Sequence, residues 1–145
     1  MNLSELTLKE FRAGLLDKKF SAVEAVESFF SQIKKDDKEI GAYLNLNEED
    51  ALARAREVDE ILSAGGDIGE LTGAPLAIKD NILIGGMPVT AASKILENYT
   101  ATYDATVIKK LKAQKAIFLG KTNLDEFAMG SSTENSAFQL TRNPH

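Results

Sequence analysis

The sequence contains no cysteine and only one histidine, His145, among its 145 residues. Without cysteine the chain cannot form a disulfide, a thiolate zinc site or a cysteine nucleophile. One histidine is too few for a multi-histidine metal site, and its position at the last residue disfavours a serine–histidine–aspartate triad. We therefore expect no metal in this chain.

Long hydrophobic runs and an excess of basic residues are missing as well. The apolar runs are far shorter than the ~20 residues that span a bilayer, and the acidic N-terminus does not resemble a secretory leader. These absences predict a cytoplasmic protein without a membrane segment. The net charge is −5, and residues 1–70 hold nine basic against sixteen acidic residues. Such a chain is a poor direct ligand for nucleic acid, because phosphate contacts need lysine or arginine clusters.

The first half of the chain is typical of helices. Two capping patterns, Thr7 with Glu10 and Ser21 with Glu24, each precede apolar residues at helical spacing. Residues 42–47 alternate between apolar and polar, which predicts a short strand. Asn47 can then cap a third helical pattern that ends at the glycine pair 65–66.

The second half alternates between strand and helix patterns. We expect strands within 76–84 and 116–120, a helix capped by Asp104, and a short helix capped by Asn123 with Glu126. The last fifteen residues form a polar tail without a closing element. The fold class is therefore α/β: an N-terminal helical region over 1–70, then over 71–145 the first part of a mixed sheet covered by helices.

Lys79 is the first candidate for chemistry, since it interrupts the mostly apolar run 76–84. An ammonium carried toward a core or a cleft floor loses its proton readily, and a neutral lysine is a general base. Two structural alternatives stay open, in which Lys79 reaches solvent or pairs with Asp80. Asp80 and Asn81 are expected to hydrogen-bond backbone groups at the end of the strand.

A small polar stretch, residues 130–133, is the second candidate, and a surface loop is its alternative. A serine there could act as a nucleophile only with a base beside it, and Lys79 is the only plausible base in the chain. The glycine pairs at 65–66 and 85–86 fit neither a phosphate loop nor a dinucleotide motif. No nucleotide site is therefore indicated.

Several segments resemble a known family. GAPLAIKDN, residues 73–81, resembles the lysine motif of the amidase signature family. Within that family, four further segments resemble the glutamine-hydrolysing A subunits of tRNA-dependent amidotransferases; they are residues 92–99, 103–107, 120–136 and 141–144. DEFAMGSSTENS, residues 125–136, is highly specific, whereas the Lys-Asp-Asn motif alone marks only the wider family.

The resemblance implies a catalytic set of serine, cis-serine and lysine, in which Lys79 is the base toward the cis-serine. Met129, Ser131 and Ser132 would flank the substrate pocket. In the family, the glycine- and serine-rich segment that supplies both serines follows the position of His145. We therefore expect this chain to be the N-terminal third of a longer enzyme, and to be inactive by itself.

The implied reaction is hydrolysis of glutamine to glutamate and ammonia through a glutamyl-serine intermediate. Ammonia would pass to the partner subunits B and C, where ATP and Mg²⁺ activate glutamate on misacylated tRNA. This chain would hold no cofactor and would meet tRNA only indirectly. Two alternatives stay open: another amide hydrolase of the same family, or a non-catalytic binding and assembly module.

Overall fold

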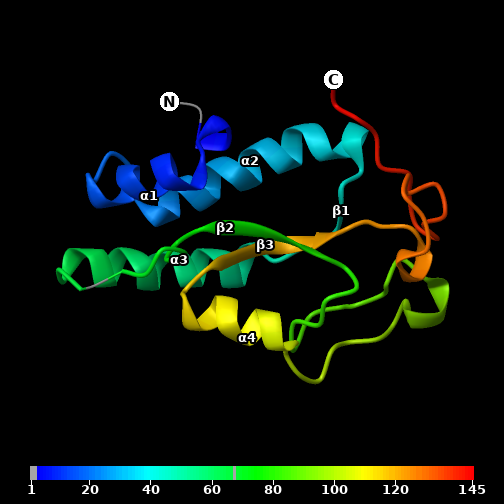
Figure 1. The fold of residues 1–145 in the computed structure, drawn as a ribbon. Coiled ribbons are helices and arrows are strands. Elements are labelled where there is room, and N and C mark those ends of the chain that lie inside the picture. Colours follow the sequence, from blue (N-terminus) through cyan, green and yellow to red (C-terminus); the bar gives the residue numbers. More distant parts are fainter. Residues whose placement is uncertain (1–2, 67) are drawn as a thin grey trace.

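A computed structural model describes residues 3–66 and 68–145. Four α-helices, three strands and three short 3₁₀ turns follow one another in this part of the chain (Figure 1). Their bounds are η1 Leu3–Glu5, α1 Leu8–Leu16, α2 Ala22–Ile40, β1 Tyr43–Leu46, α3 Glu48–Ser63, β2 Pro75–Lys79, η2 Lys94–Leu96, α4 Thr106–Ala113, β3 Ile117–Thr122 and η3 Glu126–Ala128. None of the described helices is long and apolar enough to cross a membrane.

The two predicted capping boxes are confirmed. Thr7 accepts a hydrogen bond from the Glu10 backbone N–H, and Glu10 accepts one from the Thr7 backbone N–H in return. Ser21 and Glu24 make the same reciprocal pair at the start of α2. Each pair satisfies two backbone donors that the first helical turn would leave without partners.

The three strands form one mixed sheet, which confirms the predicted α/β class. The strand order is β1–β3–β2, with β1 antiparallel and β2 parallel to the central strand β3. Because β1 lies within residues 1–70, the helical half contributes a strand to the sheet. The domain boundary near residue 70 stays a prediction.

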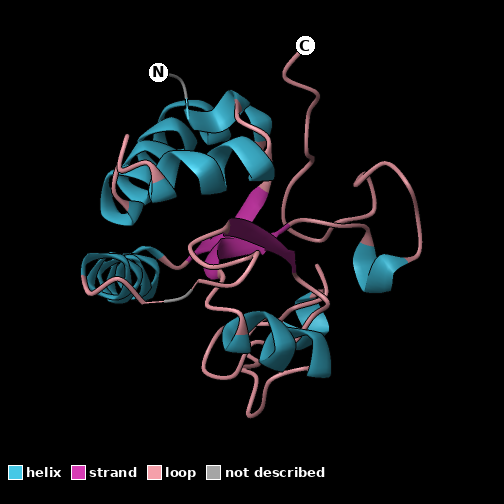
Figure 2. Cartoon of the chain, turned by 60° about the vertical axis from the view of Figure 1, so that its left-hand side comes forward, coloured by secondary structure: helices cyan, strands magenta, loops and turns pink. Residues whose placement is uncertain are grey.

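Helices cover both faces of the sheet (Figures 1 and 2). One core, on the side of α1, α2 and α3, contains Phe11, Phe30, Ile117 and Leu119 among its buried residues. The other core lies between the sheet and α4, and its buried residues are Ile78, Ile84, Met87, Ile108, Ala116 and Phe118. Strand β3 therefore supplies side chains to both cores.

Strand β3 is irregular at Gly120. Leu76 pairs with Phe118 but the next residue of β2, Ala77, pairs with Gly120, so β3 carries one extra residue at Leu119. A Cβ on Gly120 would lie well under 3.0 Å from the carbonyl oxygen of Asn45. Glycine is needed here because the backbone of β1 comes too close for any side chain.

Three predicted caps differ from the structure. Asn47 does occupy the N-cap of α3, but its side chain donates to Asp50 and to the Phe118 carbonyl oxygen and caps no backbone N–H. Helix α4 begins after Ala105, one residue later than expected. Asp104 does not cap it, because the Asp104 carboxylate accepts from the Gly85 N–H and from Lys112. The third, Asn123, is described below with its loop.

Replacing Gly120 with alanine should destabilise the sheet, because the added methyl group overlaps the backbone of β1. We expect the free energy of unfolding to fall by about 1–3 kcal/mol, measured by urea denaturation. Gly85→Ala is the matched control, since a Cβ there meets only contacts of 3.4 Å or longer. Equal stability of the two variants would contradict the close approach at Gly120.

Candidate active site

Lys79 is the last residue of β2 and is exposed. The alternative in which Lys79 reaches solvent is confirmed. Its ammonium does not point into a core, and it does not pair with Asp80, whose partner is Lys121. In residues 3–66 and 68–145 no hydrogen bond or ion pair of the Lys79 side chain is observed. The ammonium is thus available to a group brought up to this end of the sheet.

The buried lysine of the sheet is Lys121 on β3, which we did not predict. Its side chain is completely buried, and its Nζ lies 3.1 Å from Asp80 Oδ1 and donates to the Ile82 carbonyl oxygen at 2.8 Å. Burial lowers the pKa of Lys121, and the Asp80 carboxylate opposes that shift. The sequence signal was a lysine directly after the apolar run 116–120, where a strand continues by two residues.

Asp80 connects the end of β2 to the following loop. Its carboxylate accepts from the Thr90 N–H at 2.9 Å and from the Thr90 hydroxyl at 2.5 Å, and it is fully buried. The Asp80 carbonyl oxygen accepts from the Ala91 N–H at 3.1 Å. The prediction that Asp80 hydrogen-bonds backbone groups is confirmed.

Two pairs of consecutive residues with left-handed backbone meet beside this loop. Ala91 and Ala92 have φ values of 51° and 53°, and Phe127 and Ala128 have φ values of 53° and 62°. The Phe127 N–H donates to the Ala91 carbonyl oxygen at 2.9 Å. Non-glycine residues pay roughly 1–2 kcal/mol each for this conformation, so the surrounding hydrogen bonds must hold both turns.

The expected helix capped by Asn123 is wrong. Only a 3₁₀ turn forms at Glu126–Ala128, and its centre departs from helical geometry at Phe127. The Asn123 amide donates instead to the Gln139 carbonyl oxygen and to Thr141. The loop after the turn closes on Asp125, whose carboxylate accepts from the backbone N–H groups of three residues: Ser132, Thr133 and Asn135.

Met129, Ser131 and Ser132 lie on this loop and are exposed, with 73% of Met129 accessible to solvent. Ser132 is held through its backbone N–H on Asp125, while its hydroxyl donates to Glu134. The three side chains that the resemblance assigns to substrate binding therefore face solvent from a loop with a fixed backbone.

Backbone contacts connect this loop to the end of β2. The Phe127 N–H donates to Ala91, and the Ala91 N–H donates to Asp80, the residue beside Lys79. The pockets described in the molecule are lined neither by Lys79 nor by the exposed loop residues. The structure thus brings the two candidate segments to one end of the sheet.

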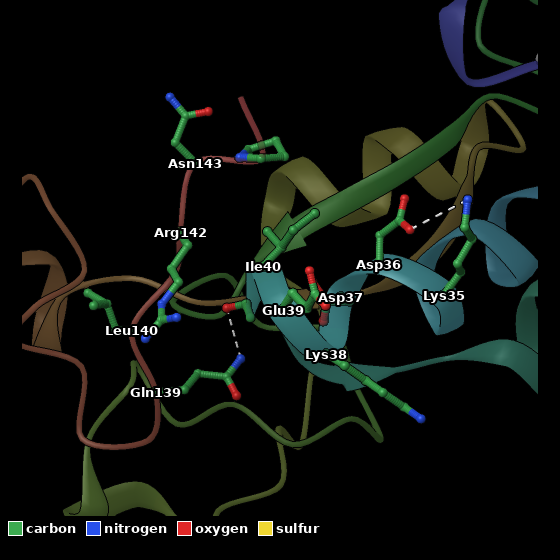
Figure 3. A pocket seen from close by; sticks show the side chains of 12 residues that line it. Lys35, Asp36, Asp37, Lys38, Glu39, Ile40, Gln139, Leu140, Arg142 and Asn143 are labelled. Carbon is green, nitrogen blue, oxygen red and sulfur yellow. Dashed lines mark hydrogen bonds and ion pairs between the residues drawn. The ribbon is translucent and has the colours of Figure 1, made fainter.

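The polar tail is not a free segment. Gln139 donates from its amide to the carbonyl oxygens of Gly41 and Tyr43, and the Arg142 N–H donates to the Ile40 carbonyl oxygen. Residues of the tail and of the last turns of α2 line an open groove of about 1110 Å³ (Figure 3). These contacts dock the tail on the carbonyl end of α2 and replace the closing element that the sequence lacked.

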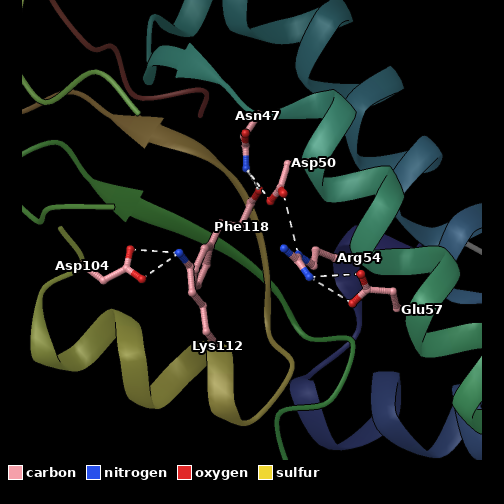
Figure 4. Close-up of polar contacts among 7 residues, drawn as sticks. All are labelled: Asn47, Asp50, Arg54, Glu57, Asp104, Lys112 and Phe118. Carbon is pink, nitrogen blue, oxygen red and sulfur yellow. Dashed lines mark hydrogen bonds and ion pairs between the residues drawn. The ribbon is translucent and has the colours of Figure 1, made fainter. Parts of the chain in front are cut away.

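A smaller cavity between α3 and α4 is lined by residues that form ion pairs. Arg54 contacts Asp50 and Glu57, and Lys112 contacts Asp104, on opposite sides of Phe118 (Figure 4). Each of these charges already has an opposite charge as its neighbour. The cavity therefore belongs to the packing of the two helices.

Comparison with known proteins gives the family. A family model for amidases matches residues 24–145, which is most of the chain. The chain belongs to the amidase family. Two of its motifs for this family lie near the ends of strands: residues 73–81, with Lys79, span β2, and residues 120–136 begin within β3.

Relatives of this amidase chain carry one recurring name, the A subunit of glutamyl-tRNA(Gln) amidotransferase. The chain is 49% identical over 144 residues to the A subunit numbered 2 of Clostridium acetobutylicum, a match that covers 99% of this chain and 30% of the relative. The A subunit of Carboxydothermus hydrogenoformans is 52% identical over 144 residues, which again cover 99% of this chain and 30% of the relative. The chain thus spans about 30% of the length of these curated relatives.

The solved structure of the glutamyl-tRNA(Gln) amidotransferase A subunit from Thermotoga maritima has the same fold in this region. It superimposes with a TM-score of 0.75 at 38% identity, over 99% of this chain and 28% of that one. The observed helices and mixed sheet are therefore part of an amidase-signature fold, as the sequence motifs predicted.

The pKa of Asp125 is lowered below its ordinary value of 3.8, chiefly by the backbone N–H groups of Thr133 and Asn135. A carboxylate whose pKa is lower in the folded state stabilises the fold when ionised, and this contribution is lost as the pH falls through the folded pKa. Asp125→Asn should therefore lower the urea midpoint at neutral pH. Its difference from the unaltered chain should shrink as the pH falls below 3.8.

The control for this pH series is Glu60→Gln. Glu60 is exposed, and no side-chain hydrogen bond or ion pair is observed for it among the described residues. Its midpoint should follow that of the unaltered chain at every pH. A difference between Asp125→Asn and the unaltered chain that stays constant with pH would show that the carboxylate charge does not hold the loop.

Proposed function

We propose that the chain is part of the glutamine-hydrolysing A subunit of a tRNA-dependent amidotransferase. The observation that carries this proposal is near 50% identity over 99% of the chain to proteins named as A subunits of glutamyl-tRNA(Gln) amidotransferase. The candidate site supports it, because the lysine motif and the DEFAMGSSTENS segment meet at one end of the sheet through the contacts of Asp80, Ala91 and Phe127.

In this proposal Lys79 is the general base. It accepts the proton that a cis-serine relays from a nucleophilic serine, and both serines belong to the glycine- and serine-rich segment that follows this region in the family. The exposed ammonium of Lys79 at the end of β2 supports the role, since nothing in the described residues occupies it. Packing of the serine segment against this end of β2 would bring the cis-serine hydroxyl within reach of the Lys79 side chain.

Met129, Ser131 and Ser132 are proposed to contact glutamine. All three are exposed, and Asp125 holds the backbone of the loop at Ser132. Ser131 and Ser132 are binding groups in this proposal and not nucleophiles. By themselves, these 145 residues should not hydrolyse glutamine, because they supply the base without the serine pair.

The partners proposed are subunits B and C, with ATP and Mg²⁺ used by the partner that activates glutamate on tRNA. Ammonia released from glutamine would travel to that partner. The acidic surface of residues 1–70 agrees with tRNA being bound elsewhere in the complex, and the cytoplasm is the proposed compartment.

Lys79→Met in the longer protein, purified together with subunits B and C, should abolish glutamine hydrolysis. Loss of the base should lower kcat by about 10²–10⁴-fold or more, measured as glutamate and ammonia release from glutamine. Lys110→Met is the matched control, because Lys110 is an exposed lysine of α4 away from the site.

Two outcomes would contradict the proposal in different ways. Normal turnover by Lys79→Met would exclude Lys79 as the base. Hydrolysis of simple amides with no ammonia from glutamine, in the unaltered protein, would favour another amide hydrolase of the family.

A further inference from the structure

The Lys121–Asp80 pair lies just after the point in β3 where the side chains stop alternating regularly between the two faces of the sheet. Before the irregularity, Ile117 and Leu119 contribute to the core of α1 to α3, while Phe118 contributes to the core of α4. Strict alternation would therefore place the side chain of Lys121 on the side of Ile117 and Leu119. The extra residue at Leu119 moves Lys121 to the face of α4, where Asp80 lies.

On β2, the same register decides the surroundings of Lys79. Ile78 pairs with Lys121 and Lys79 pairs with Thr122. Ile78 and Asp80 are buried on the α4 face, and Lys79 between them is exposed on the other face. Because side chains alternate, a shift of one residue would bury the Lys79 ammonium beside Lys121 and expose the Asp80 carboxylate.

Such a buried ion pair is a poor source of stability. Removing two charges from water offsets most of their attraction, and uncharged residues of similar volume often replace such a pair without loss. The best-attested use of a buried polar contact is to select one register over its neighbours. The same shift of one residue would also turn Ile78 and Leu76 out of the α4 core, so the ion pair and these apolar side chains favour the same register.

We propose that the buried Lys121–Asp80 pair is a register lock, which sets the face of the sheet on which Lys79 is presented. Lys121 and Asp80 are thus positioning residues, and their effect on Lys79 passes through the alignment of β2 on β3. The inference rests on the proposed function only for the importance of Lys79. The alignment itself is a property of these residues whatever reaction the protein catalyses.

The test is lysine labelling by reductive dimethylation, read residue by residue by mass spectrometry on the native protein. In the unaltered protein Lys79 should react in one phase at a rate like that of exposed Lys110, and Lys121 should be protected. Equal labelling of Lys121 and Lys110 would overturn the proposal, because the pair would then not be buried.

The informative variant is the double replacement Asp80→Asn with Lys121→Met. Asparagine keeps an oxygen for the Thr90 N–H and hydroxyl, and methionine keeps an unbranched side chain in the core. We expect this variant to fold, with an unchanged far-ultraviolet circular dichroism spectrum, but with Lys79 labelling split into a fast and a slow phase. The slow phase reports molecules in which Lys79 has turned into the core.

Two results would overturn the register lock. One is a folded double variant in which Lys79 still reacts in a single phase at the unaltered rate. The other is loss of the folded state, which would make the pair a source of stability and not of alignment. Lys121→Met alone leaves Asp80 buried without its counter-charge and should be less stable than the double variant.

The labelling test separates this inference from the proposed function. Its readout is the surroundings of Lys79 and does not require glutamine hydrolysis. A split in labelling together with normal hydrolysis by Lys79→Met would support the register lock and reject Lys79 as the base. Single-phase labelling of Lys79 in the double variant, together with an inactive Lys79→Met, would reject the register lock and support Lys79 as the base.

Discussion

The ion pair between Lys121 and Asp80 is the contact on which the C-terminal end of the sheet depends. It joins the central strand to the edge strand inside the α4 core, where neither charge has access to water. Asp80 in turn holds Thr90 and, through its carbonyl oxygen, Ala91. The loop that carries Met129 and the two serines is attached to Ala91 through Phe127 and to Ala92 through Ala137, so backbone contacts connect it to the same pair.

A second buried carboxylate, that of Asp125, holds the backbone of the loop over residues 130–135. Asp125 gathers three backbone N–H groups that belong to no helix or strand, and this contact replaces regular secondary structure over 130–135. The left-handed turns at Ala91 and Phe127 lie between the two carboxylates. The hydrogen bonds of Asp80 and Asp125 flank these turns and stabilise their strained backbone. The backbone of the exposed loop is therefore ordered at the end of the sheet.

Much of the fold could be predicted because its signals are local. The capping boxes at Thr7 and Ser21 formed as expected, since both partners lie within one helical turn. The same reasoning failed at Asp104 and Asn123. There the side chains bond to residues far along the chain: Asp104 to Gly85 and Asn123 to Gln139. A side chain that makes such a bond uses the polar group that would otherwise cap the helix.

By itself the sequence determined the starts of α1 and α2, the approximate positions of the strands and the motifs that assign the amidase family. The motifs also marked Lys79 as the candidate base without any knowledge of its surroundings. Only the tertiary structure decided which lysine is buried. Lys79 and Lys121 both adjoin apolar residues, but one extra residue in β3 and the pairing of two distant strands direct Lys121 inward and Lys79 outward. Burial depends on strand register, and register is set by contacts between segments that are far apart in sequence.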